Sequence, residues 1–85
     1  SKGDHSQKSD AARHIFNVDG NEITIGIISD SFDCLGGALS DKHSKDLPEN
    51  ILIIEEALEC TDKLDEGRAL MQIIHDVAPG AKLIF

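Results

Sequence analysis

The sequence predicts an α/β protein with a partial parallel sheet and flanking helices, in the order α-β-β-α-β. Residues 23–29 and 51–55 are dense in β-branched side chains and nearly continuous in apolar character, which is typical of strands covered on both faces of a parallel sheet. Between the second strand and a last apolar run at residues 81–85, segment 65–77 repeats apolar side chains at helical spacing. A strand, helix and strand in succession favour a right-handed crossover between parallel strands.

The N-terminal part is expected to contain one helix. Residues 1–9 are polar and are expected to be frayed. Residues 10–16 place their apolar side chains on one helix face, with Ser6 or Ser9 as the N-cap. The Asp-Gly-Asn sequence at residues 19–21 then favours a turn with positive φ, which leads into the first strand.

The helix of segment 65–77 has start and stop signals. Asp65 is the expected N-cap, and Pro79 followed by Gly80 is expected to end the helix. The expected core-facing stripe has i, i+3, i+4 and i+7 spacing and consists of Leu70, Ile73, Ile74 and Val77. Residues 34–50, with two adjacent glycines and charges of mixed sign, are expected to form an irregular surface loop.

Length and charge exclude several classes of function. The chain has 85 residues, 16 acidic against 8 basic, and a formal net charge of −8, which argues against nucleic-acid and anionic-membrane partners. It contains neither a stretch of roughly 20 apolar residues that could span a bilayer nor a signal-peptide pattern. Because two helices cannot cover both faces of the sheet, we expect residues 10–85 to be the N-terminal part of a larger domain.

The two cysteines, Cys34 and Cys60, leave two interpretations open. A disulfide in an oxidising compartment would contribute about 3–4 kcal/mol on the chain-entropy estimate, whereas two buried free thiols are the alternative. Neither these residues nor the histidines have the spacing of a zinc site, so no metal ligand and no cofactor are predicted. A cluster of acids lacks the alternating pattern of a Ca²⁺ loop and is expected to be a solvated face: Asp41, Asp46, Glu49, Glu55, Glu56 and Glu59.

Two other acids are candidates for chemistry. Asp30 directly follows the first predicted strand, and Glu66 lies in the first turn of the long helix. In open parallel sheets, ligands bind beyond the carboxyl ends of the strands, so both residues are expected at that edge. Two such acids could share a proton or orient a nucleophile. The alternative is that Asp30 caps a loop and Glu66 caps the helix.

Two segments resemble subtilisin-like serine peptidases. Ile-Gly-Ile-Ile-Ser-Asp-Ser at residues 25–31 is similar to the strand that carries their catalytic Asp. Residues 65–81, which begin Asp-Glu-Gly-Arg and include Val-Ala-Pro-Gly-Ala, resemble the helix that begins with the catalytic His. Glu66 stands at the position of that His, and glutamate there is typical of the sedolisin branch, which uses Ser, Glu and Asp. The resemblance covers residues 10–85.

The chain also departs from that pattern. Sedolisins usually carry a second acid one helical turn after the Glu, where this sequence has Leu70. The neighbouring Ser29 leaves the register of the catalytic Asp open by one residue. No segment has the Gly-Thr-Ser context of the nucleophilic serine, and the residue of the oxyanion hole also lies further downstream in both families.

The resemblance implies part of a serine-type endopeptidase with an acyl-enzyme mechanism, a subtilisin-like fold and catalytic roles for Asp30 and Glu66. It implies peptide or protein substrates, secretion or a cell-surface location, and further protein that covers the sheet; it allows Ca²⁺ in a longer parent protein. The chain alone is expected to be inactive because it lacks the nucleophile. The alternative is a non-catalytic peptidase homologue used for binding or assembly.

Overall fold

The structure, a computed structural model, describes all 85 residues and confirms the α/β class with a three-stranded parallel sheet. The helices are α1 (Lys2–Ser6), α2 (Ser9–Phe16), α3 (Ala38–His43) and α4 (Glu66–Val77). The strands are β1 (Thr24–Gly26), β2 (Ile51–Leu52) and β3 (Lys82–Ile84). None of the helices combines the length and apolar character needed to cross a membrane.

The strand β3 lies at the centre of the sheet, in the order β1-β3-β2. Leu83 pairs with Ile25 on one side and with Ile51 on the other, and it is fully buried. All three strands are shorter than predicted, although single ladder hydrogen bonds continue beyond them. The Ile27 amide donates to the Ile84 carbonyl at 2.8 Å, and the Ile54 amide donates to that of Phe85 at 2.7 Å.

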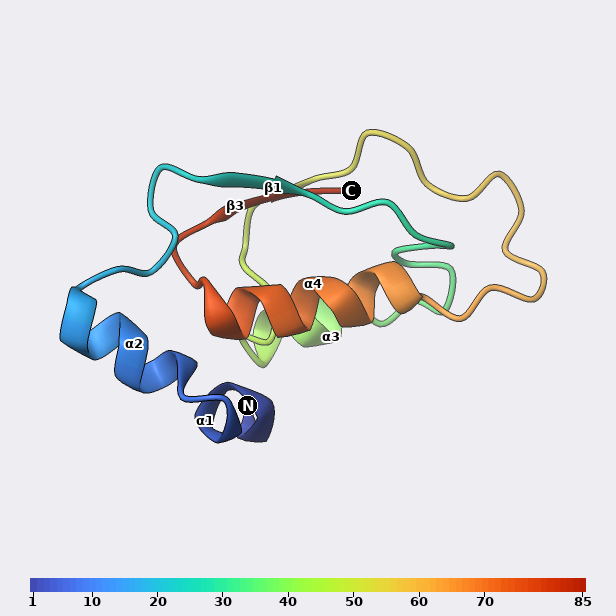
Figure 1. Cartoon of the computed structure of the whole chain (residues 1–85). Coiled ribbons are helices and arrows are strands. Elements are labelled where there is room, and N and C mark those ends of the chain that lie inside the picture. Colours follow the sequence, from blue (N-terminus) through green and yellow to red (C-terminus); the bar gives the residue numbers. More distant parts are fainter.

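Only one face of the sheet is covered. The helices α3 and α4 lie on the same side of the strands (Figure 1). The buried core, which lies between these helices and the sheet, consists of Ile27, Phe32, Ala38, Leu47, Met71, Ala81 and Leu83. On the other face Leu52 is 57% exposed, and beyond the strands Ile28 and Ile54 are 99% and 72% exposed. The near-continuous apolar runs predicted a sheet covered on both faces, whereas only one face of the sheet is covered in the structure.

The helix α4 has the predicted length but a different buried stripe. Its inward side carries the buried Gly67 and Met71 and the half-buried Ile74. Leu70 and Ile73, which were expected in the core, are 45% and 59% exposed. Because this helix has adjacent apolar residues, such as Leu70 and Met71, more than one of its faces could turn toward the core. Packing against the rest of the protein decides which face is buried.

The expectation of a frayed N-terminus is wrong, because residues 1–9 contain α1 and the start of α2. The Arg13 guanidinium donates to both carboxylate oxygens of Asp4, at 2.6 and 2.7 Å, and to the Val77 carbonyl at 3.0 Å. This arginine therefore joins α1, α2 and the end of α4. Lys8, rather than either predicted serine, occupies the N-cap position of α2.

The segment expected to be an irregular loop contains α3. Asp33 Oδ1 accepts a hydrogen bond of 2.9 Å from the Ala38 amide, which satisfies a free donor at the start of this helix. Ala38 and Leu47 are buried in the core. The segment is therefore ordered by one capping acid, Asp33, and two buried apolar side chains, Ala38 and Leu47. These are too few residues to form a helical pattern in the sequence.

The disulfide interpretation is the one found in the structure. Cys34 and Cys60 are joined, with their Cα atoms 5.2 Å apart and a sequence separation of 26 residues. A loop of this length contributes about 3.5 kcal/mol on the chain-entropy estimate.

Replacing both cysteines by serine is therefore expected to lower the free energy of unfolding by about 3.5 kcal/mol. Urea titration in the absence of reductant measures the change. Reductant should destabilise the wild-type protein by a similar amount and leave the double variant unchanged. Equal stability of the oxidised wild type and the double variant would contradict the prediction.

Candidate functional site

Asp30 lies four residues beyond the end of β1, at the N-terminus of α4. Its Oδ1 accepts hydrogen bonds from the amides of Ser31 (2.6 Å) and Glu66 (2.9 Å), and its Oδ2 accepts one from Leu64 (2.9 Å). The predicted cap, Asp65, occupies the N-cap position but makes no side-chain capping bond there. Asp30 therefore caps α4 from a distant part of the sequence.

These contacts stabilise the ionised form of Asp30. The Leu64 amide lowers the pKa of this carboxyl, partial burial opposes the shift, and the amides of Ser31, Glu66 and Gly67 lower it further. The N-terminal end of the α4 dipole favours the same negative charge. Asp30 is therefore a fixed anion at this edge of the sheet.

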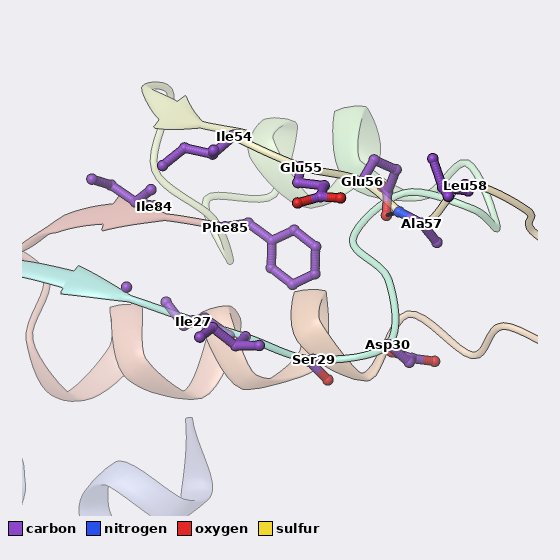
Figure 2. A pocket seen from close by; sticks show the side chains of 12 residues that line it. Ile27, Ser29, Asp30, Ile54, Glu55, Glu56, Ala57, Leu58, Ile84 and Phe85 are labelled. Atoms are coloured by element: carbon purple, nitrogen blue, oxygen red, sulfur yellow. Dashed lines mark hydrogen bonds between the residues drawn. The ribbon is translucent and has the colours of Figure 1, made fainter.

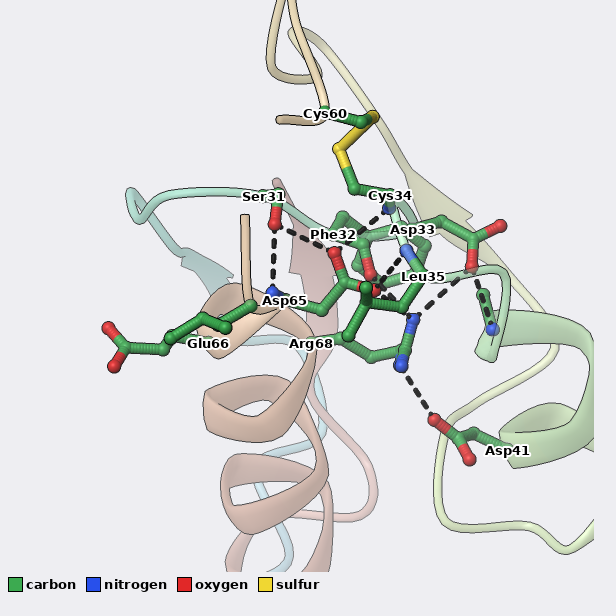
Figure 3. Close-up of polar contacts among 12 residues, drawn as sticks. Ser31, Phe32, Asp33, Cys34, Leu35, Asp41, Cys60, Asp65, Glu66 and Arg68 are labelled. Carbon is green, nitrogen blue, oxygen red and sulfur yellow. Dashed lines mark hydrogen bonds and ion pairs between the residues drawn. A yellow bond between two sulfur atoms is a disulfide. The ribbon is translucent and has the colours of Figure 1, made fainter. Parts of the chain in front are cut away.

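Glu66 is the first residue of α4 and has an exposed side chain. Its backbone amide binds Asp30, while its carboxylate takes part in no hydrogen bond or ion pair. Figure 3 shows this carboxylate directed away from the neighbouring polar cluster. The structure thus brings the two candidate residues together through the backbone of Glu66 and leaves their carboxylates without a mutual hydrogen bond.

Asp65 is the main polar residue that sequence reasoning did not identify as part of the site. It is 3% exposed, and its carboxylate accepts hydrogen bonds from the Ser31 hydroxyl and from the amides of Cys34 and Leu35 (Figure 3). Burial alone would raise its pKa, but the Ser31 hydroxyl, the two amides and the Arg68 charge together lower it. Asp65 therefore anchors the loop that follows Asp30.

Arg68 pairs with Asp65, as expected, but within a larger and partly buried cluster. Its guanidinium lies 2.7 Å from Asp65, 3.2 Å from Asp33 and 2.9 Å from Asp41, and its side chain is only 14% exposed. It also donates to the Phe32 carbonyl at 3.0 Å. One cation thus connects α4 with α3 and with the loop that precedes α3.

Glu56 was expected on a solvated acidic face and instead binds backbone. Its carboxylate accepts hydrogen bonds from the amides of Phe32, Asp33 and Ala57, the shortest being 2.7 Å from Asp33. Burial alone would raise the pKa of Glu56, but these three donors lower it overall. The segment after β2 is therefore tied to loop 31–35 both by this carboxylate and by the disulfide.

An open cleft of ≈570 Å³ lies where the central strand ends, between segments 27–30 and 54–58 (Figure 2). Its floor is apolar and includes the ring of Phe85. Asp30 lines one side and Glu56 the other, whereas Glu66 does not line it. The two predicted residues therefore share an edge of the sheet but not this cleft.

Gly67 allows the close packing that builds this edge. A Cβ atom at this position would lie 2.7 Å from the Ser31 carbonyl oxygen and would overlap the ring of Phe85. Replacing Gly67 by alanine is therefore expected to lower the free energy of unfolding by about 1–3 kcal/mol, although alanine is the better helix former.

Urea titration tests this expectation, with Gly3→Ala as the matched control. Gly3 also lies in a helix, and its nearest atom would be 3.8 Å from an added Cβ. The control should be neutral or stabilising, and an equally neutral Gly67→Ala would contradict the packing argument.

No three His, Cys, Asp or Glu side chains lie in an arrangement that could hold a metal ion. The charged groups of the site are the amide-bound carboxylates of Asp30, Glu56 and Asp65, the exposed carboxylate of Glu66, and the Arg68 guanidinium. No family model, curated protein or solved structure matches the chain. What the site can do follows from its own residues and geometry.

Acid is expected to destabilise the fold because Asp30, Glu56 and Asp65 all have lowered pKa values. As the pH falls, the unfolded chain takes up protons near pH 4, while the folded carboxylates take them up only at lower pH. The unfolded state then binds more protons, so the free energy of unfolding decreases with falling pH. The stabilisation is complete above about pH 5 and is lost below about pH 4.

Urea titrations at pH 7, 5, 4 and 3 measure this dependence. In an Asp30→Asn variant the decrease between pH 5 and pH 3 should be smaller, because one of the three carboxyl groups no longer titrates. Constant stability over that range in the wild-type protein would be inconsistent with the prediction.

Proposed function

We propose that this chain is the N-terminal part of a subtilisin/sedolisin-like serine endopeptidase domain and supplies its acid and base residues, Asp30 and Glu66. One observation carries the proposal. Asp30 Oδ1 accepts a hydrogen bond of 2.9 Å from the Glu66 amide, so the carboxylate of one acid holds the backbone of another, 36 residues away in sequence, at the C-terminal edge of a parallel sheet. That edge is where open α/β sheets perform their chemistry.

The two acids suit different roles. The Glu66 carboxylate is exposed and unpaired, so it can accept the proton of a serine hydroxyl as the serine oxygen attacks a peptide carbonyl. The same group would return the proton to the leaving amine, and water would then hydrolyse the acyl-enzyme. Asp30 fixes the backbone of Glu66 and stays ionised. Because a carboxylate is a weaker base than imidazole, such a site works at acidic pH.

Other features support the same assignment. The bare face of the sheet offers a surface that further parts of the domain would cover, and the disulfide is typical of oxidising, extracellular compartments. The substrate would be a peptide or protein, and the proposed chemistry needs no cofactor. The 85-residue chain alone would not hydrolyse peptides, because the nucleophilic serine is supplied from outside it.

The coding sequence beyond Phe85 tests the proposal. It should encode a Gly-Thr-Ser type segment, and a fluorophosphonate probe should label that serine in the protein that contains it. A stop codon directly after Phe85, or a longer protein that the probe does not label, would overturn the assignment.

A non-catalytic binding or assembly module is the second candidate. It is favoured by the occupancy of both Asp30 carboxylate oxygens, which accept hydrogen bonds from backbone amides, as a purely capping residue would. This candidate predicts a folded protein without probe labelling and without peptidase activity. The labelling experiment therefore distinguishes the two functions.

A further inference from the structure

Ser31 and Asp65 form a reciprocal, buried hydrogen-bonded pair. The Ser31 hydroxyl donates to Asp65 Oδ1 at 2.7 Å, and the Asp65 amide donates to the same hydroxyl oxygen at 2.9 Å. Ser31 is fully buried and Asp65 is 3% exposed. Neither residue lines the open cleft, so the pair has no direct access to a ligand there.

Each member of the pair is the direct chain neighbour of a candidate catalytic residue. Ser31 follows Asp30, and Asp65 precedes Glu66. A second link runs alongside the pair, from the Glu66 amide to Asp30 at 2.9 Å, and a third runs from the Gly67 amide to the Ser31 carbonyl at 3.1 Å. Two short segments that lie far apart in the sequence are thus held together by parallel contacts.

Asp65 is held in one conformation from several sides. Its backbone is left-handed, with φ of 54°, which is uncommon for a residue other than glycine and persists where the surroundings enforce it. The amides of Cys34 and Leu35 and the guanidinium of Arg68 bind its carboxylate at 2.7–2.9 Å. Ser31 is therefore held by Asp65, whose own position is fixed by these contacts.

We propose that Ser31 and Asp65 are positioning residues, which hold Asp30 against the start of α4 and thereby set the placement of Glu66 relative to Asp30. A serine hydroxyl suits this role because it donates one hydrogen bond and accepts another at the same atom. Because the pair is buried, water cannot replace either bond without opening the structure. The consequence for catalysis rests on the proposed function, whereas the structural role does not.

The Ser31→Ala variant of the 85-residue chain tests the proposal by NMR. We expect the pKa of the Asp30 carboxyl to rise toward its ordinary value, since loss of the pair loosens the backbone donors that hold it. The Glu66 amide should exchange with solvent about tenfold faster, the change expected for the loss of one hydrogen bond. Ser40→Ala, at an exposed position of α3, should change neither quantity.

A purely structural role gives a different result. If Ser31→Ala lowers the melting temperature while the Asp30 pKa and the Glu66 amide exchange stay as in the wild type, the proposal is overturned. Restoration of both quantities by Ser31→Thr, which keeps the hydroxyl, would support it further.

Hydrogen exchange of the wild-type chain keeps the proposal testable if the alanine variant does not fold. The Asp65 amide, bound to Ser31, and the Glu66 amide, bound to Asp30, should open together with the same exchange protection. Much weaker protection of the Glu66 amide would show that the pair does not hold Asp30 and would overturn the proposal. These readouts need no activity, so they are independent of whether the longer protein is a peptidase.

Discussion

The rate of peptide hydrolysis is expected to fall by a factor of about 10²–10⁴ when Glu66 is replaced by glutamine. The variant is made in the longer protein that, under the proposed function, contains both this chain and the nucleophilic serine. Glutamine has almost the same size and shape but cannot take up a proton at neutral or acidic pH. The Glu66 side chain makes no hydrogen bond or ion pair in the fold, and it is exposed. The substitution should therefore remove the base without disturbing the structure.

Steady-state kinetics at the pH optimum measures this effect, and it should appear in kcat with little change in KM. Glu59→Gln is the matched control, because Glu59 is likewise exposed and lies outside the candidate site. The control should retain the wild-type rate. Near-normal turnover in Glu66→Gln would remove Glu66 from the mechanism and favour the non-catalytic module.

The free energy of unfolding is expected to fall by about 3–5 kcal/mol when Asp65 is replaced by alanine, which breaks a buried polar network. Four donors lose their partner: the Ser31 hydroxyl, the amides of Cys34 and Leu35, and the Arg68 guanidinium. Arg68 keeps two other carboxylates, so the main penalty comes from the hydroxyl and the two amides.

Urea titration at pH 7 measures the loss. Glu49→Ala removes an exposed carboxylate that makes no hydrogen bond, and it should change the stability by less than about 0.5 kcal/mol. The stability loss of Asp65→Asn should lie between those of Asp65→Ala and Glu49→Ala, because the asparagine amide oxygen can still accept a hydrogen bond from the Ser31 hydroxyl. A loss below about 1 kcal/mol in Asp65→Ala would mean that the network contributes little.

Local sequence patterns predicted the positions of the strands and of α4, because a run of β-branched residues or a helical repeat of apolar residues is visible within a short stretch of sequence. They did not predict where the strands end. The strand β1 ends at Gly26, the last of its residues in register with β3, and only one further hydrogen bond, from the Ile27 amide, continues the ladder. The rotation of α4 was also beyond local signals. Apolar side chains at both Leu70 and Met71 fit a helical stripe, and only packing against the sheet selects Met71.

The candidate site was predicted in part for a related reason. Asp30 and Glu66 stand out because one follows a strand and the other starts a helix. Glu56 and Asp65 bind backbone amides 23 to 31 residues away in the sequence, and such pairings have no sequence pattern. The one available signal for Asp65, an Asp directly before a helix start, has an ordinary capping explanation that the structure does not support.

The capping of α4 by Asp30 has a consequence for how the protein folds. The hydrogen bonds from Leu64 and Glu66 to Asp30 close loops of 34 and 36 residues. Closing such loops costs chain entropy before any contact forms, and folding slows as contacts become less local. On the ribosome, Asp30 is synthesised well before α4, and until Leu64 and Glu66 emerge only the adjacent Ser31 amide can donate to it. We therefore expect this edge of the sheet to assemble among the last parts of the molecule, after α4 has formed.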